Sequence, residues 1–201
     1  MVEVFAELSC PFTHVGLRRL VARRAETGSH VRLRVKAWPL EWVNGDPLAP
    51  DFVAEEIAAL RAQVAPDLFG GFDPTTFPPT TLPALAVASL AYSTDLGVGE
   101  AVSLALRDAL FERGLDIADP GVLADIAAAH GVDAASADPD AVRAEYEEGK
   151  ARGVVGSPYF FLSSVGYFCP ALDITKVDGH LSITANVAEF DEFVARALGS
   201  R

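Results

Sequence analysis

A cysteine followed by a proline stands at the junction between a strand-like and a helix-like segment. Val2–Leu8 is an apolar run typical of a buried strand, and Phe12–Thr27 has the pattern of a helix that ends at Gly28. If Cys10 is the N-cap and Pro11 the first helical residue, the sulfur faces the unpaired N–H groups at the positive end of the helix. Those groups favour the reactive thiolate, so the sequence predicts a nucleophilic thiol with a lowered pKa.

The neighbours of this cysteine refine the prediction. Thr13 stands where a redox Cys-x-x-Cys motif has its second cysteine, so the motif indicates a nucleophile more firmly than a dithiol couple. The Thr13 hydroxyl either hydrogen-bonds the thiolate or is an ordinary first-turn side chain. Glu7 either moves a proton near the sulfur or is a polar strand end. His14 points elsewhere on the helix, which disfavours pairing with the thiolate.

The order of the other elements predicts a mixed fold. Val31–Ala37 alternates apolar and basic residues, which indicates an edge strand with one face in the core and the other in water. Tyr159–Leu162 and Tyr167–Cys169 flank a turn, which predicts a hairpin, and Val187–Leu198 predicts a closing helix. The expected helices between these parts are Pro50–Val64, Leu82–Leu96, Glu100–Glu112, Pro120–His130 and Pro139–Ala151.

Composition excludes several classes of protein. The net charge is −12, with +4 on residues 1–36 and −16 on the remainder, which argues against general nucleic-acid binding. No apolar run reaches the ~18 residues of a membrane span, and the first strand begins too early for a signal segment, so we expect a cytoplasmic protein that makes no membrane contact. Two cysteines do not make a disulfide scaffold, and four scattered histidines do not predict a metal site.

Three stretches resemble the DsbA-like branch of the thioredoxin superfamily. They are Cys10–Leu20, the turn Gly153-Val154-Val155-Gly156-Ser157-Pro158, and Leu110–Ile117. The resemblance covers nearly the whole chain and implies an α/β, thioredoxin-like fold with an inserted all-helical domain. The expected domains are residues 1–50 with 153–201, and the insertion 51–152. The resemblance also implies that Pro158 is cis and faces Cys10.

The departures from the family pattern leave the reaction open. Thr13 replaces the resolving cysteine, and Ser157 precedes the proline where Thr or Val is usual. Kappa-class glutathione transferases and 2-hydroxychromene-2-carboxylate isomerases also lack the second cysteine. We therefore expect a monothiol thiol-disulfide oxidoreductase, with two alternatives: a thiol-cofactor-dependent isomerase or transferase acting on an aromatic small molecule, or a non-catalytic binding protein. In the isomerase alternative, Trp38, Phe72 and Phe77 would line a pocket between the two subdomains.

Cys169 is a candidate second thiol. Two short strands of similar length would return the chain to the level of Pro158, which would place Cys169 near Cys10 as a distal resolving thiol. The alternative is an inert buried cysteine. A disulfide between them would require Cα atoms within ~7 Å.

The resemblance also bears on ligands and partners. We expect no tightly bound cofactor, with a low-molecular-weight thiol as the candidate ligand at Ser157, Pro158 and Trp38. The backbone beside Pro158 could pair with an extended protein disulfide substrate, and a small-molecule substrate is the other candidate. We expect a homodimer only because the resembled family commonly forms one.

Overall fold

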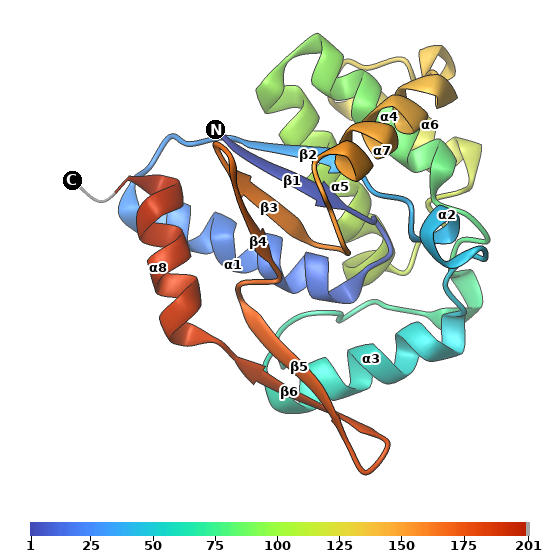
Figure 1. Ribbon diagram of the computed structural model, residues 1–201. Coiled ribbons are helices and arrows are strands. Elements are labelled where there is room, and N and C mark those ends of the chain that lie inside the picture. The colour runs from blue at the N-terminus through green and yellow to red at the C-terminus, as the bar shows by residue number, and fades with distance from the viewer. Residues whose placement is uncertain (200–201) are drawn as a thin grey trace.

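The computed structural model describes residues 1–199 and shows an α/β architecture (Figure 1). The last two residues of the predicted 153–201 segment lie outside the described residues. A four-stranded sheet has the order β2-β1-β3-β4, and β5 and β6 form a separate hairpin. In chain order, the strands and helices are β1 (Val2–Ala6), α1 (Pro11–Thr27), β2 (Leu33–Ala37), α2 (Leu40–Asn44), α3 (Pro50–Gln63), the 3₁₀ turn η1 (Pro74–Thr76), α4 (Leu82–Thr94), α5 (Leu96–Arg113), α6 (Pro120–Ala129), the 3₁₀ turn η2 (Ala134–Ser136), α7 (Pro139–Ala151), β3 (Tyr159–Leu162), β4 (Val165–Phe168), β5 (Leu172–Val177), β6 (His180–Ala185) and α8 (Val187–Leu198).

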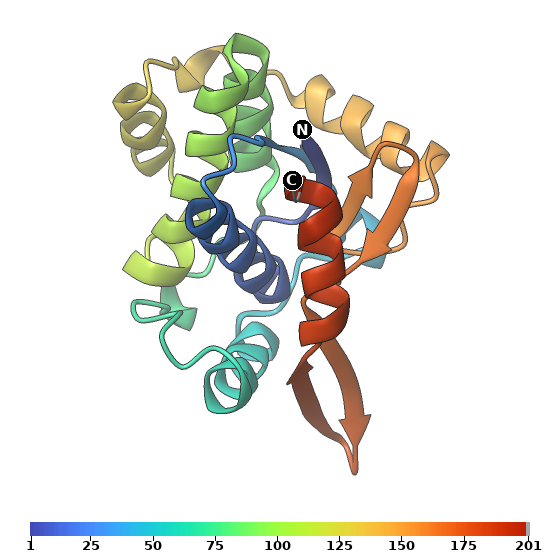
Figure 2. The same cartoon turned by 90° about the vertical axis from the view of Figure 1, so that its left-hand side faces the viewer.

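The central strand β1 organises the sheet. It runs parallel to β2 and antiparallel to β3, and β3 turns into β4 as the predicted hairpin. Its alternate residues Val2, Val4 and Ala6 belong to the main core, while Phe5 faces a smaller cluster on the other side of the sheet. Helices α1 and α8 pack together beside the sheet (Figures 1 and 2).

The strand β2 lies at the edge of the sheet, as predicted, but its basic face is only partly in water: Arg32 is exposed and Arg34 is half-buried, whereas Lys36 is buried. The Lys36 side chain is buried and pairs with Glu3 at 2.9 Å and with Glu148 at 2.6 Å. Glu148 belongs to α7, which packs against β2. The expectation of a solvated face was wrong at Lys36, because an alternating pattern cannot show that a helix more than 100 residues later covers that end of the strand.

The five expected helices between β2 and β3 are present, with α7 at its predicted bounds. Helix α5 begins earlier than expected, at Leu96, because the Asp95 carboxylate accepts the N–H groups of Gly97 and Val98 at 2.7 and 3.2 Å. Helices α4, α5 and α7 pack against β2, so this helical block covers one edge of the sheet. No helix within residues 1–199 combines the length and apolar character needed to cross a membrane.

Apart from the two 3₁₀ turns, two parts of the fold were not predicted. The first is the short helix α2, which directly follows the end of β2. The second is the hairpin of β5 and β6, which projects from one end of the molecule beyond α8 (Figures 1 and 2). The sequence does carry a signal for this hairpin that was missed, because β6 alternates polar and apolar residues and Asp178-Gly179 between the strands is a common hairpin turn.

Candidate active site

Cys10 is the N-cap of α1 and lies against the predicted proline turn. Its backbone is extended, with φ −80° and ψ 113°, and Pro11 begins the helix. The thiol is only 4% exposed, and Sγ donates to the carbonyl oxygen of Ser157 at 3.4 Å. The Ser157–Pro158 peptide bond is cis. The two sequence motifs, which are 147 residues apart, therefore meet in the fold.

Two hydroxyl groups lie beside the thiol. Oγ1 of Thr13 and Oγ of Ser157 are 2.8 Å apart, and the Glu7 N–H donates to the same serine oxygen at 2.9 Å. Thr13 is fully buried. The Thr13 position is therefore more than an ordinary first turn, since its hydroxyl links the helix to the proline turn.

The pKa of Cys10 does not follow the expectation. Burial raises it, although hydrogen bonds from the Thr13 hydroxyl and backbone N–H lower it in part. The negative charge of Glu56 adds to the rise. The predicted lowering was wrong because removal of the thiolate from water outweighs the favourable helix N-terminus. Cys10 is therefore a buried, protonated thiol in the resting protein.

Glu7 is held by two backbone N–H groups and one hydroxyl group. Its carboxylate accepts the Ser9 N–H at 3.0 Å, the Ser9 hydroxyl at 3.3 Å and the Leu40 N–H at 2.9 Å. These bonds join the turn between β1 and α1 to the start of α2. This geometry favours the alternative in which Glu7 is a structural carboxylate.

His14 points away from Cys10, as the helical periodicity predicted. Its Nε2 lies 2.7 Å from Glu112 Oε1, and its ring packs against Phe69 and Phe111. Although burial acts to raise the pKa of Glu112, hydrogen bonds from His14 and from the Phe69 and Gly70 N–H groups hold it at about 2. This cluster fixes the loop after α3 to α5.

Cys169 returns to the level of the proline turn. Tyr159 pairs with Phe168 in the hairpin, and the Cys169 N–H donates to the Pro158 carbonyl at 3.1 Å. Both cysteines are free and buried. Burial, followed by the charge of Cys10, raises the pKa of Cys169 to about 12. The Cys10 thiol and the Cys169 backbone N–H thus donate to neighbouring carbonyl groups of the Ser157–Pro158 dipeptide.

The expected aromatic pocket is not assembled. Trp38 is buried with Phe5 and packs on Tyr146 of α7 at 5.0 Å between ring centroids. Phe72 packs on Phe77 at 6.2 Å. The structure therefore does not bring Trp38 to Cys10, because the ring fills the space beneath α7 instead.

Sequence reasoning missed two charged residues near the thiol. Glu56 of α3 is 8% exposed, and burial raises its pKa to about 7. Arg107 of α5 is fully buried, donates to the Glu7 carbonyl at 3.1 Å, and has a pKa lowered by burial to about 10. The one signal available for Arg107 was a cation within an apolar helical run. Within residues 1–199, no cluster of three or more His, Cys, Asp or Glu side chains is arranged to hold a metal ion.

Comparison with solved structures agrees with this geometry. A "probable DsbA oxidoreductase" from Streptomyces coelicolor has a TM-score of 0.65 and 19% identity, with 100% of this chain and 90% of that chain covered. A 2-hydroxychromene-2-carboxylate isomerase has a TM-score of 0.64 and 16% identity, with 83% and 87% covered. The cytosolic disulfide reductase DsbM from Pseudomonas aeruginosa has a TM-score of 0.55 and 17% identity, with 96% and 95% covered. At these identities the likeness establishes the fold.

Comparison at the level of sequence gives the family. Curated protein sequences give no match. Residues 1–182 match the family described as the DSBA-like thioredoxin domain, which is most of the chain. The fold, the helical block between β2 and β3 and the proline turn beside Cys10 fit this match. The chain therefore belongs to the DSBA-like thioredoxin domain family.

Proposed function

We propose that this protein is a thiol-disulfide oxidoreductase that uses Cys10 as a single nucleophile. The observation that carries the proposal is the contact of the Cys10 thiol with the Ser157 carbonyl, beside a cis proline and at a helix N-terminus. The thiol is 4% exposed, so an approaching disulfide has to displace the residues that cover it. The family of the chain and its oxidoreductase neighbours support the same class of reaction.

The proposed first step is thiol–disulfide exchange. Cys10 loses its proton, and its sulfur attacks one sulfur of a substrate disulfide. The substrate S–S bond breaks, Cys10 forms a mixed disulfide, and the second substrate sulfur leaves as a thiolate that takes up a proton. The Thr13 hydroxyl and N–H supply hydrogen bonds to the Cys10 thiolate, which offset part of the cost of burying it.

The proposed substrate is a disulfide in a protein or a small molecule. An extended peptide would pair with the backbone beside Pro158, in the way that a strand adds to a sheet edge. A second thiol then attacks the mixed disulfide, and the proposed donor is a low-molecular-weight thiol used in the cytosol. Similarity to a cytosolic disulfide reductase supports this choice.

Cys169 is the alternative source of that second thiol. Its N–H bond to Pro158 places it at the same turn as Cys10. Attack by Cys169 on the mixed disulfide would release the substrate thiol and leave a disulfide between the two cysteines. Its pKa of about 12 means that few molecules hold a Cys169 thiolate at neutral pH, so the external thiol is the favoured route.

The test is to trap the mixed disulfide with oxidised glutathione and locate it by peptide mass spectrometry. We expect one glutathione on Cys10 in the wild type and in Cys169→Ser, and none at that site in Cys10→Ser. A disulfide between Cys10 and Cys169 in the wild type would assign the second step to Cys169. The absence of any adduct or disulfide on Cys10 would overturn the proposal and favour a non-catalytic binding protein.

A further inference from the structure

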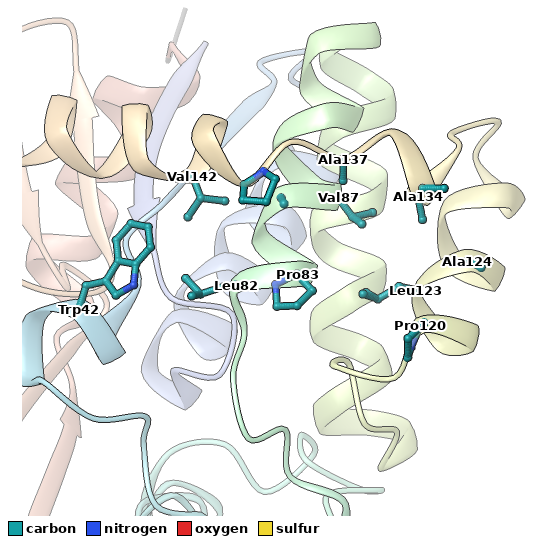
Figure 3. Close-up of a pocket in the computed structure, with 13 residues that line it drawn as sticks. Trp42, Leu82, Pro83, Val87, Pro120, Leu123, Ala124, Ala134, Ala137 and Val142 are labelled. Atoms are coloured by element: carbon teal, nitrogen blue, oxygen red, sulfur yellow. The ribbon is translucent and has the colours of Figure 1, made fainter.

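A cavity of about 420 Å³ that is partly open to solvent lies among the helices of the helical block, away from the thiol site (Figure 3). It is bordered by Trp42 of α2 and by the first turns of α4, α6 and α7. Apart from the indole N–H of Trp42, every side chain that lines it is hydrocarbon. This volume falls in the ~300–1,000 Å³ range of small-molecule sites. It is almost three times the ~150 Å³ of a dry cavity that holds benzene.

Proline rings form part of the wall. Pro83, Pro120 and Pro139 stand in the first turns of three different helices, and all three line the cavity. Proline has no N–H and a fixed φ, so each ring presents a rigid hydrocarbon surface where a helix start would otherwise offer a donor. Alanines such as Ala86 and Ala124 occupy the next positions along the wall and leave the space open.

The charges at the helix starts around the cavity disfavour an anion. Helix N-termini normally attract negative groups, but here aspartates occupy two of them. The Asp119 carboxylate accepts the Gly121 and Val122 N–H groups at 2.8 and 3.0 Å. The Asp138 carboxylate accepts the Asp140 N–H at 2.9 Å. An acidic ligand would therefore meet negative caps and no positive side chain in the lining.

The Trp42 ring favours an aromatic occupant. Arg143 lies over this ring at 4.8 Å from its centroid, and the Tyr146 ring packs on it at 5.3 Å with an interplanar angle of 73°. These two contacts fix the indole, which forms one end of the cavity in Figure 3. Fixed aromatic rings stack on or pack edge-to-face with other rings, which adds to the apolar contacts.

We propose that this cavity is a binding site for an uncharged aromatic molecule of two or three rings. Cys10 and Ser157 do not line it, so the site is separate from the thiol chemistry and does not depend on the proposed function.

The test compares two probes of the same shape and different charge by isothermal titration calorimetry at pH 7. The neutral probe is 2-naphthol and the anionic probe is 2-naphthoate. We expect 2-naphthol to bind with a stoichiometry of one, and 2-naphthoate to bind at least tenfold more weakly. Failure of 2-naphthol to bind, or equal affinities for the two probes, would overturn the proposal.

A pair of variants on α6 locates the binding site. Ala124 and Ala128 are both exposed alanines, and only Ala124 lines the cavity. Ala124→Leu fills the cavity and should weaken 2-naphthol binding at least tenfold, whereas Ala128→Leu should change it less than twofold. If Ala124→Leu does not fold, Ala135→Leu fills the cavity from another wall.

Two results with these variants would count against the site. Unchanged 2-naphthol binding in the cavity-filling variant would place the ligand elsewhere. A wild-type dimer that Ala124→Leu abolishes, together with no 2-naphthol binding, would assign the cavity to a second copy of the chain.

Discussion

Replacing Glu56 by glutamine should stabilise the protein at neutral and alkaline pH. Glu56 lies on α3 with 8% of its surface exposed, and burial raises its pKa from 4.5 to about 7, with Lys176 offsetting only part of the rise. The folded state therefore binds the proton more tightly than the unfolded state. Stability is present while the carboxyl is protonated and falls as the pH rises from about 4.5 to about 7.

The size of the effect follows from the pKa. Each pKa unit is worth about 1.4 kcal/mol, so ionised Glu56 costs about 3 kcal/mol of folding free energy above pH 7. Glutamine resembles the protonated acid and avoids this cost. We expect Glu56→Gln to exceed the wild type in unfolding free energy by about 1 kcal/mol at pH 5 and about 3 kcal/mol at pH 8.

Urea unfolding at pH 5 and pH 8 measures this difference directly. Glu55→Gln is the matched control, because Glu55 is the exposed neighbour on the same helix and its substitution removes the same charge without touching a buried carboxyl group. A second readout is the pH dependence of Cys10 alkylation. Since the charge of Glu56 raises the pKa of Cys10, the midpoint should fall in Glu56→Gln. Equal stability of Glu56→Gln and wild type at pH 8 would refute the reasoning.

Three further substitutions test contacts at the candidate site and elsewhere in the fold. Ser157→Ala removes a hydroxyl that opposes the burial-driven rise in the pKa of Cys10, so the pH midpoint of Cys10 alkylation should rise. The unfolding free energy in urea should fall by about 1–3 kcal/mol, because the Glu7 N–H loses its acceptor. An unchanged alkylation midpoint would contradict the contact between the Ser157 hydroxyl and the thiol. Glu112→Gln removes a carboxylate with a pKa of about 2, which stabilises the fold above pH 4.5 and loses this effect as the pH falls toward 2. After solvent screening, we expect the unfolding free energy of the wild type in urea to exceed that of the variant by about 1–2 kcal/mol at pH 6 and by less at pH 3. The same difference at both pH values would contradict this role of Glu112. Gly149→Ala would place a Cβ 2.8 Å from carbons of the Trp38 indole and should lower the unfolding free energy in urea by about 1–3 kcal/mol. Gly16→Ala is the control and should change it little, because its Cβ would lie 3.9 Å from the nearest atoms. Similar losses in both variants would contradict the close packing of Gly149 on Trp38.

Local signals in the sequence were enough to predict the core of the site. A proline after Cys10 fixes the start of α1, and the hairpin of equal strands returns Cys169 to Pro158. Both predictions depend on short-range geometry, in which chain direction and strand length determine position. The contact of Cys10 with Ser157 is long-range, and it was accessible only through the resemblance to a known family.

The helices that cover β2 and bring Glu56 near the thiol were not predictable from local signals in the sequence. The basic side of β2 looked solvated because its alternation is the same whether water or α7 faces it. Glu56 lies 46 residues after Cys10 on a helix with an ordinary amphipathic pattern, and nothing in that pattern identifies what its buried acid faces. Tertiary packing decided both outcomes.

The pKa of Cys10 shows why this limit matters for function. A cysteine at a helix N-terminus has a local preference for the thiolate, and the Thr13 hydroxyl supports it. Burial and the nearby Glu56 charge act in the opposite direction and outweigh that preference. The motif therefore predicts which atom is the nucleophile, whereas the surrounding fold determines the pKa of that atom. Two chains with the same Cys-Pro-Phe-Thr motif can differ in thiol reactivity through the helix that covers it.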